Sequence, residues 1–251
     1  MKSPATGVTI KQVSKGFEPG VAVVDSLDLE LAAGRFTVLI GPSGCGKTTV
    51  LRMVGGLIEP CAGEITYTST RPTMGFCFQE PRLLPWRSVR SNVGLPLELN
   101  GEDSSARRDA VDAALALVGL SGAAELLPAA LSGGMKMRTA LARSLVNDPG
   151  LLLLDEPFGA LDEVTRFRLD EDVSSLLRNR EVTVLLVTHS IAEAVFLADE
   201  IVVLSSRPAR IVERFEVDFQ TRDAQLRMTP AFAEMSGRVY EALQSGSEDS
   251  A

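Results

Sequence analysis

Short hydrophobic runs alternate along this chain with segments of helical spacing. Residues 36–40, 151–154 and 182–187 are continuously apolar, and several of their side chains are β-branched, which predicts strands buried on both faces. Leucine alternates with acidic residues over 27–31, which predicts a strand with one buried face. The same criteria predict further short strands over residues 8–13, 74–78, 201–204 and 211–217.

Helical periodicity fills the segments between these strands. A helix is predicted over 47–54, where a pair of glycines ends it, and others over 163–177 and 230–243. Because strands alternate with helices, we expect a parallel sheet with helices on both faces. Between residues 88 and 146 helical spacing dominates, notably over 105–118. The fold class is therefore α/β, with a helical insert near residues 88–146.

Composition narrows the possible functions. The 251 residues fit one large domain or two modest ones, and 45% hydrophobic content supports a substantial core. The net charge of −8 argues against a protein that binds nucleic acid through bulk positive charge, although a local basic groove stays possible. Three cysteines without a C-x-x-C pair suit a reducing compartment. We see no secretory signal and no apolar run long enough to span a bilayer, so any membrane role would come through a partner.

A glycine-rich segment with the pattern G-x-x-x-x-G-K-[ST] lies between a predicted strand and a predicted helix. That context favours a phosphate-binding loop over a chance match. Its glycines permit a nest of backbone N–H groups around phosphate oxygens, Lys47 would reach the β and γ phosphates, and the Thr48 hydroxyl would bind Mg²⁺. Cys45 is expected to be a small filler. The candidate ATP-binding residues here are Gly41, Pro42, Ser43, Gly44, Cys45, Gly46, Lys47, Thr48 and Thr49.

Two carboxylates end the apolar strand predicted over 151–154. A buried central strand would deliver Asp155 to the carboxyl edge of the sheet, where ligands bind in α/β folds. Asp155 could then hold Mg²⁺, and Glu156 could act as a general base toward an attacking water. Two solvated acids at a strand end are the alternative, which the phosphate-binding loop disfavours.

His189 and Gln79 also follow predicted strands. His189 is the single histidine of the chain and comes directly after the strand over 182–187. A lone histidine is more often structural, but the convergence of several strand ends favours a γ-phosphate contact. The Gln79 amide could join the Mg²⁺ or water shell, or it could cap a turn.

A second anion-binding helix start is predicted at Ser132-Gly133-Gly134, directly before a helix over 135–146. Serine is a favoured N-cap, and the open amide groups of a helix start attract anions. Together with the first loop and the acidic strand end, this segment suggests two surfaces that clamp one nucleotide.

These motifs, in this order, resemble those of the ATP-binding subunits of ABC transporters. GPSGCGKTT resembles the Walker A loop, LLLLDEP the Walker B strand and LSGGM the signature motif. Gln79 is similar to the Q-loop glutamine, His189 to the switch histidine and Ala160-Leu161-Asp162 to the D-loop. The match extends roughly over residues 8–217. Residues 78–89, 188–194 and 206–208 are similar to the nitrate, sulfonate and taurine import group.

The resemblance implies a P-loop NTPase (RecA-like) core with a parallel-rich sheet, an N-terminal antiparallel β part and an inserted α-helical subdomain. It implies an ATPase domain over residues 1–220, with the helical subdomain at about 88–146, and a C-terminal helical tail over 221–251. Phe17 would stack on adenine, although an ordinary partly exposed aromatic is the alternative. At the positions of Met135 and Met137, many members of the family carry glutamine. Phosphate binding by the signature motif is expected to depend on Ser132 and the two glycines.

The resemblance also implies the activity and the partners. ATP and Mg²⁺ would bind between two copies of the chain, with Lys47, Gln79, Glu156 and His189 as catalytic residues. Thr48, Gln79 and Asp155 would hold the metal. Ser132, Gly133, Gly134 and Met135 would act on the site of the other copy, near Asp162 of the D-loop. The homodimer would power an importer for nitrate, sulfonate, taurine or a related solute.

Such a subunit would work at the cytoplasmic face of the inner (plasma) membrane, peripherally. It would bind permease subunits and, indirectly, a periplasmic or extracellular solute-binding protein, and no nucleic acid. Trp86 would contact the permease, or it would be a core residue of the insert. The first alternative function is a soluble ABC ATPase of repair, assembly or translation, which the short insert and single cassette disfavour. The second is a P-loop kinase or nucleotide-binding regulator, which would need neither LSGG nor the histidine.

Overall fold

A mixed six-stranded sheet forms the centre of the protein. The computed structural model describes residues 3–70, 72–159, 162–178 and 180–248. The strand order is β5-β6-β7-β3-β8-β9, and all neighbours are parallel except β8 and β9. The bounds are β5 Met74–Cys77, β6 Leu151–Asp155, β7 Thr183–Thr188, β3 Phe36–Ile40, β8 Glu200–Leu204 and β9 Ile211–Glu216. Every residue of β3, β6 and β7 is buried, as the apolar runs predicted.

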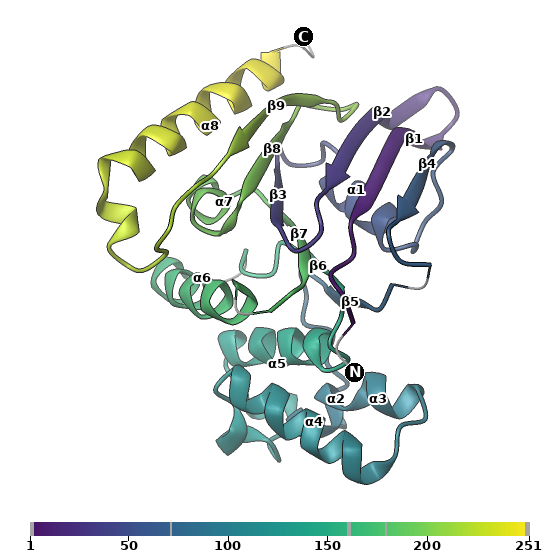
Figure 1. Ribbon diagram of the computed structural model, residues 1–251, viewed down its shortest axis with the longest axis vertical. Helices are drawn as coiled ribbons and strands as arrows, with labels where there is room; N and C mark the ends of the chain where they lie inside the picture. Colours follow the sequence, from purple (N-terminus) through teal and green to yellow (C-terminus); the bar gives the residue numbers. More distant parts are fainter. Residues whose placement is uncertain (1–2, 71, 160–161, 179, 249–251) are drawn as a thin grey trace.

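A second, antiparallel sheet lies beside the first (Figure 1). Its order is β2-β1-β4, with bounds β1 Val8–Glu18, β2 Val21–Leu31 and β4 Ala62–Tyr67. The first two strands are longer than predicted and turn at Gly20, whose φ of 77° suits glycine. The pattern did not predict β4, because its side chains are exposed or half-buried and do not alternate clearly. Pairing with β1, not local sequence, makes this segment a strand.

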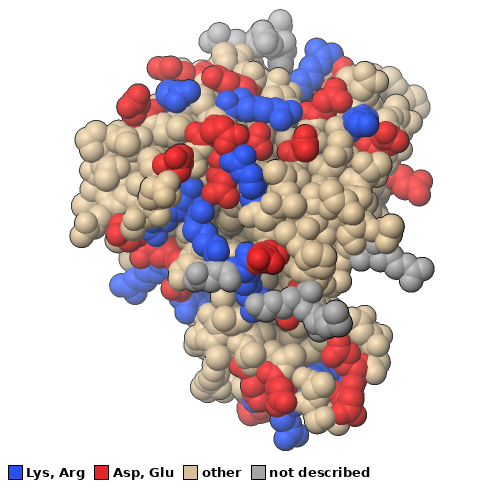
Figure 2. Space-filling view, viewed as in Figure 1, with Lys and Arg blue, Asp and Glu red and all other residues tan. Residues whose placement is uncertain are grey.

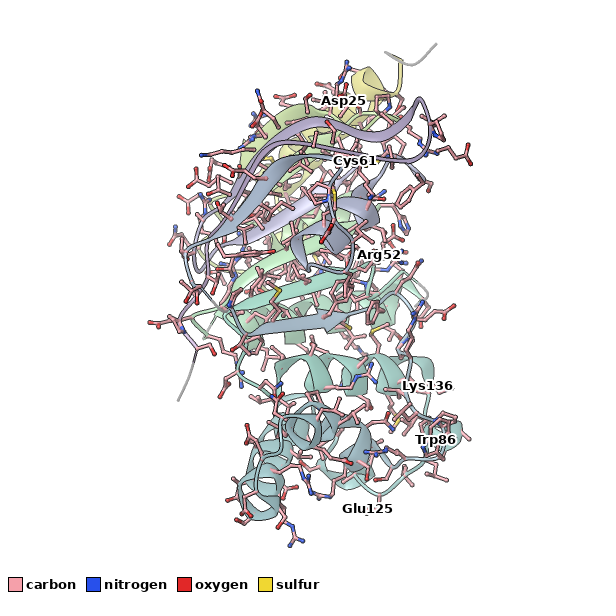
Figure 3. All side chains as sticks on the ribbon, turned by 90° about the vertical axis from the view of Figure 1, so that its right-hand side faces the viewer. Asp25, Arg52, Cys61, Trp86, Glu125 and Lys136 are labelled. Carbon is pink, nitrogen blue, oxygen red and sulfur yellow. The ribbon has the colours of Figure 1, made fainter. Side chains whose placement is uncertain are left out.

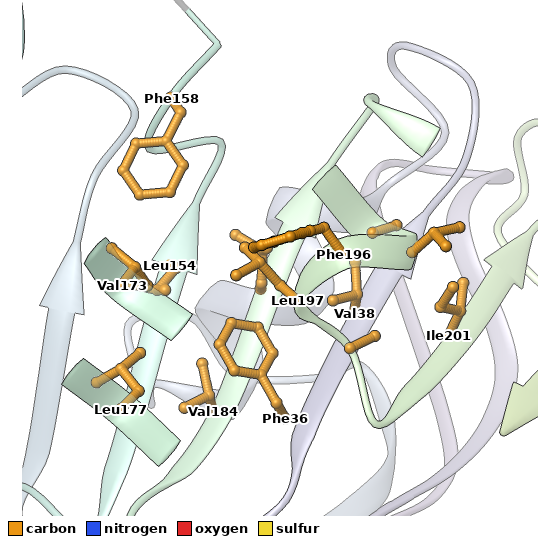
Figure 4. Close-up of a cluster of buried hydrophobic side chains, with 14 of the residues drawn as sticks. Phe36, Val38, Leu154, Phe158, Val173, Leu177, Val184, Phe196, Leu197 and Ile201 are labelled. Carbon is orange, nitrogen blue, oxygen red and sulfur yellow. The ribbon is translucent and has the colours of Figure 1, made fainter. Parts of the chain in front are cut away.

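Helices cover both faces of the central sheet, but unequally. One face packs against α5 (Gly133–Leu145), α6 (Glu163–Arg178), α7 (Ile191–Leu197) and α8 (Pro230–Glu248), with a core that Figure 4 shows in part. The other face packs against α1 (Lys47–Val54) and the antiparallel sheet. The sequence pattern predicted α1 over the same residues and did not predict α7. The side chains of α7 are buried nearly all round, so no polar face marks it as a helix.

The helical insert has a hydrophobic core of its own, below the sheets in Figure 1. It contains α2 (Val89–Val93), α3 (Leu95–Leu99) and α4 (Ser104–Leu117), with short 3₁₀ turns at Ser121–Ala123 and Pro128–Ala130. The α5 helix contributes to this core and to the core under the sheet. It therefore joins the insert to the sheet.

The C-terminal segment packs on the core. A 3₁₀ turn at Leu226–Met228 precedes α8, and α8 contacts α7, β8 and β9. The Arg222 guanidinium donates hydrogen bonds to the carbonyl oxygens of Phe196 and Ala198, each at 2.6 Å, at the C-terminal end of α7. Unpaired carbonyls at a helix end need such donors. The segment thus holds α7 against the sheet.

Charged side chains of both signs are interspersed on the face drawn in Figure 2. Arg35 pairs with Glu216 and Arg178 with Asp199, which lies 3.0 Å away. Exposed pairs of this kind add little stability, about 0–1 kcal/mol each. None of the helices in the described part of the chain combines the length and apolar character needed to cross a bilayer.

Candidate functional site

The loop between β3 and α1 is shaped by its glycines. A Cβ atom at Gly41 would lie 3.0 Å from the carbonyl oxygen of Leu204, which is tighter than side chains normally accept. Gly46 has φ 122°, and Gly44 has φ 76° with open space around it. Positive φ values cost little only at glycine. The glycines therefore allow the sharp turns of this loop, which can direct backbone N–H groups toward an anion.

Lys47 is held inside this loop. Its Nζ donates hydrogen bonds to the carbonyl oxygens of Gly41, at 2.8 Å, and Pro42, at 3.0 Å, and the residue is 5% exposed. Cys45 is buried beside it, and burial raises the pKa of its thiol. A thiol that stays protonated is a poor nucleophile. The prediction that Cys45 is a filler is consistent with this placement.

Thr48 and Asp155 meet at the carboxyl edge of the sheet. The Thr48 hydroxyl donates a hydrogen bond to Asp155 Oδ1 at 2.7 Å, and burial raises the pKa of this carboxyl. Hydroxyl and carboxylate oxygens are ligands that Mg²⁺ accepts. No group of three or more His, Cys, Asp or Glu side chains forms a metal site within the described ranges.

Glu156 lies at the centre of a second cluster. Its Oε2 is 3.0 Å from Nδ1 of His189 and 3.5 Å from Nε2 of Gln79, the last at the limit of a hydrogen bond. These residues follow β6, β7 and β5, so the structure brings together the three strand ends that the sequence singled out. Glu156 has φ 44°, and its N–H donates to the Val187 carbonyl at 2.9 Å. This left-handed conformation turns the chain sharply out of β6 and costs energy for a residue other than glycine.

Lys47, Thr48, Gln79 and Glu156 line one cleft of about 470 Å³. Phe17, 62% exposed at the end of β1, lies on its wall, as does Val23 of β2. The site analysis of the sequence did not name Arg207, which also lines the cleft. Its position after β8, at the same sheet edge as the other site residues, is the signal that could have found it. The lining is formed by Phe17, Val23, Ser43, Gly44, Gly46, Lys47, Thr48, Thr49, Gln79, Glu156 and Arg207.

The signature segment begins α5 and does not line this cleft. Ser132 is the N-cap, and its hydroxyl accepts a hydrogen bond from the Met135 N–H at 3.3 Å. Such a cap stabilises a helix by about 1 kcal/mol. The helix starts at Gly133, two residues before the predicted start, so both glycines belong to its first turn. Ser132 and Gly133 are exposed, and their helix start faces away from the chain's own core.

The two methionines that depart from the family pattern are explained by packing. Met135 packs against the core of the helical insert. Met137 is 4% exposed, and its Sδ lies 3.7 Å from the Cys77 Sγ. A thioether fills this apolar site without needing a polar partner. Met137 therefore belongs to the core and takes no part in the surface of the signature segment.

The remaining candidates lie outside the cleft. Ala160 and Leu161 of the D-loop are outside the described residues. Asp162 is exposed, and the Thr165 N–H donates to its Oδ1 at 3.0 Å, which lowers the pKa of the carboxyl. Trp86 is 74% exposed at the edge of the helical insert (Figure 3), so the interpretation as a core residue is wrong. Asn92 fixes the loop beside it, because its side chain bonds to the backbone of Leu84, Arg87 and Ser88.

A glycine-shaped anion nest, a lysine, a hydroxyl–carboxylate pair and an adjacent glutamate at the carboxyl edge of a parallel sheet define a P-loop nucleotide-binding site. The family model described as ABC transporter matches residues 24–159. The chain belongs to the ABC transporter family and is one of its ATPase cassettes. Membership excludes the P-loop kinase alternative.

Relatives and solved structures agree with this assignment. The aliphatic sulfonates import ATP-binding protein SsuB 1 of Pseudomonas syringae pv. syringae (strain B728a) is 40% identical over 242 residues, which cover 96% of this chain and 98% of that protein. The taurine import ATP-binding protein TauB of Yersinia pestis bv. Antiqua (strain Antiqua) is 43% identical over 211 residues, or 82% of this chain and 83% of that protein. The dimeric structure of MJ0796, described as a bacterial ABC transporter cassette, has a TM-score of 0.74 and 29% identity, and covers 84% of this chain and 99% of that one.

Proposed function

We propose that this chain is the ATP-binding and ATP-hydrolysing subunit of an ABC importer for a sulfonate, taurine, nitrate or a related small solute. One observation carries the proposal: Lys47, Thr48 and Glu156 line a single cleft, where Thr48 is hydrogen-bonded to Asp155 and Glu156 contacts His189. The names of the two relatives support the direction of transport and the solute class.

Lys47 and the loop bind the phosphates. The Lys47 ammonium is bonded to two carbonyl oxygens of its own loop, which keeps the nest open around it. When ATP enters, the ammonium exchanges part of this bonding for the β and γ phosphates, which carry far more negative charge than a carbonyl. Phe17 stacks on adenine, because it offers an exposed ring on the wall of the same cleft.

Thr48, Asp155 and Gln79 hold Mg²⁺. The ion, when bound, neutralises charge on the β and γ phosphates. The Thr48 hydroxyl donates to Asp155 Oδ1, and these two oxygen groups would hold the ion, with Asp155 supplying negative charge. Burial raises the pKa of Asp155, and a bound cation would favour its charged form.

Glu156 and His189 carry out hydrolysis. Glu156 accepts a proton from water as the water oxygen attacks the γ phosphorus, and the bond to the β–γ bridging oxygen breaks to leave ADP and phosphate. His189 lies 3.0 Å from the carboxylate and orients it, with its other ring nitrogen available to the γ phosphate. Gln79 contacts the same carboxylate oxygen and positions the water.

A second copy completes the site. Ser132, Gly133 and Gly134 form an exposed helix start that the chain's own cleft does not use. The N–H groups of such a helix start, together with its dipole, bind phosphate. We therefore place them on the γ phosphate of the partner copy, with Met135 beside them and Asp162 near the contact. The dimeric state of MJ0796 supports this arrangement.

The active protein is a homodimer at the cytoplasmic face of the inner membrane, bound to permease subunits and served by a solute-binding protein. Exposed Trp86 on the helical insert is the contact to the permease. The chain divides into the ATPase domain over 1–220, with its helical subdomain over about 88–146, and the C-terminal tail over 221–251. The alternative is a soluble ABC ATPase of repair, assembly or translation.

Growth of a deletion strain on defined sulfur and nitrogen sources tests the proposal. A strain that lacks this chain should fail on one of taurine, alkanesulfonates or nitrate as the sole sulfur or nitrogen source. The wild-type chain should restore growth, whereas Lys47→Ala, which loses phosphate binding, should not. Lys11→Ala removes the same charge at an exposed position paired with Glu64 and serves as the control. Normal growth of the deletion strain on all of these sources would favour the soluble alternative.

A further inference from the structure

Arg207 carries a free positive charge into the nucleotide cleft. It lines the cleft together with Lys47 and Phe17 and is exposed. Within the part of the chain that the structure describes, no hydrogen bond or ion pair engages its guanidinium. Its neighbour Arg210 is different, because that guanidinium lies 2.5 Å from Asp25. The Arg207 side chain is therefore available to a ligand.

The backbone that presents Arg207 is tied down on both sides. The Ser205 hydroxyl lies 2.8 Å from the Ser206 carbonyl oxygen and 3.0 Å from that of Pro208. The Ser206 N–H donates to the carbonyl of Gly246 near the end of α8, at 2.9 Å. Because hydrogen bonds hold the residues around it, Arg207 loses little backbone entropy when it binds.

The same loop is joined to the nucleotide-binding elements. The Ala209 N–H donates to the Val23 carbonyl at 2.8 Å, and Val23 lines the cleft. A Cβ at Gly46 would lie 3.0 Å from that Val23 carbonyl oxygen. The loop after β8, β2 and the phosphate-binding loop thus form one continuous packed unit. The backbone position of Arg207 is therefore fixed relative to the phosphate-binding loop.

The charges of the cleft indicate what Arg207 binds. Lys47 and Arg207 are the cationic side chains among the residues that line it, and Glu156 opposes them. Lys47 is hydrogen-bonded within its own loop, whereas no described residue engages the Arg207 guanidinium. Guanidinium groups form charge-assisted, often bidentate hydrogen bonds with phosphate oxygens.

We propose that Arg207 is a nucleotide-binding residue whose guanidinium pairs with a phosphate oxygen of the bound nucleotide, most directly the α phosphate, since the nest and Lys47 take the β and γ phosphates. The inference rests on the proposed function of this cleft. It adds a residue from the loop after β8 to the site and links nucleotide binding to the end of α8 through Ser206.

Equilibrium binding of ADP to the full chain, by calorimetry at low and high salt, tests the inference. Arg207→Ala should weaken ADP binding about 3- to 10-fold at low salt, less at high salt, because an exposed charge pair is screened. Arg207→Lys should retain part of the affinity, since it keeps the charge but loses the planar guanidinium geometry. Arg108→Ala removes an equal charge from exposed α4 in the helical insert and should bind as the wild type does.

The outcomes separate the possible explanations. If wild-type protein fails to bind ADP, the proposed function fails. If wild type binds and Arg207→Ala binds equally well, only the inference is overturned. If Arg207→Lys loses as much as Arg207→Ala and salt has no influence on the loss, the guanidinium stacks on adenine instead, and the phosphate contact is overturned. In ATPase assays of Arg207→Ala the phosphate contact predicts a higher KM for ATP.

Discussion

The Glu156 carboxylate lies 3.0 Å from Nδ1 of His189, although 32 residues separate the two along the chain. Strand register explains the contact. β6 and β7 are parallel neighbours, with Asp155 opposite Val187, so the residues just beyond each strand emerge at the same sheet edge. The Glu156 N–H bonds to the Val187 carbonyl, which fixes the turn that aims the carboxylate at the histidine.

Glu156→Gln should bind ATP and fail to hydrolyse it. The amide keeps the shape and the contact with His189 but cannot accept a proton from water, so turnover should fall by about 10² to 10⁴-fold. Because the product state is not reached, ATP should hold two copies together. Phosphate release measures the first effect, and size-exclusion chromatography with ATP measures the second. A monomeric Glu156→Gln variant with normal turnover would contradict both roles.

Trp86→Ala should uncouple the subunit from its permease. The side chain is 74% exposed and makes no core contact that its loss would disturb, so the isolated subunit should keep its ATPase rate and stability. Aromatic anchors at interfaces often contribute 2 kcal/mol or more, which corresponds to about a 30-fold loss of affinity for the permease. Co-purification of the subunit with membranes that contain the permease measures this loss of binding. Leu99→Ala, equally exposed elsewhere in the insert, is the matched control.

Arg227→Met should destabilise the fold. Arg227 Nη2 donates to Asp170 Oδ2 at 2.9 Å, and the guanidinium covers the Phe196 ring at 3.6 Å. Asp170 is fully buried, and loss of its charge-assisted hydrogen bond from Arg227, with the charge of Arg166 still nearby, should cost about 1.5 to 3 kcal/mol. Urea unfolding measures the change. Asp170→Asn combined with Arg227→Met should recover part of the loss, because the two residues act as a pair.

Stability should fall as the pH rises from about 5 to 8, because of two buried carboxyls. Burial raises the pKa of Glu193 to about 8, with a further contribution from the charge of Asp170. Burial raises the pKa of Asp170 to about 7, opposed by Arg227. A raised folded-state pKa means that the folded protein binds the proton more tightly than the unfolded chain does. The stabilising effect is therefore complete below the unfolded pKa and is lost as pH passes the folded value.

Glu193→Gln tests this directly. The amide can keep the contact with the Thr188 hydroxyl, and it cannot ionise. We expect its unfolding free energy to exceed that of the wild type at pH 8, with a smaller difference at pH 5. Urea unfolding at the two pH values measures the slope. An equal slope in both proteins would show that Glu193 is not the titrating group.

The sequence predicted much of the fold because many of its signals are local. Phe36–Ile40 and Lys47–Val54 have the predicted bounds, since an apolar run and a glycine-terminated helical segment need no distant partner to be recognised. The Walker A loop was recognisable for the same reason. The signals for β4 and α7 were missing. One is an exposed strand that exists through pairing with β1, and the other is a buried helix without a polar face.

The sequence by itself determined which chemical groups this protein carries and the order in which they come: the phosphate-binding loop, the acidic strand end, the signature segment and the histidine. The tertiary structure decided which of them meet. Strand order and register bring Glu156 to His189, and the anchored loop after β8 adds Arg207 to the cleft, whereas Ser132 stays outside it. Local patterns follow from neighbouring residues, but these contacts depend on packing between segments far apart in the chain, which no local pattern encodes.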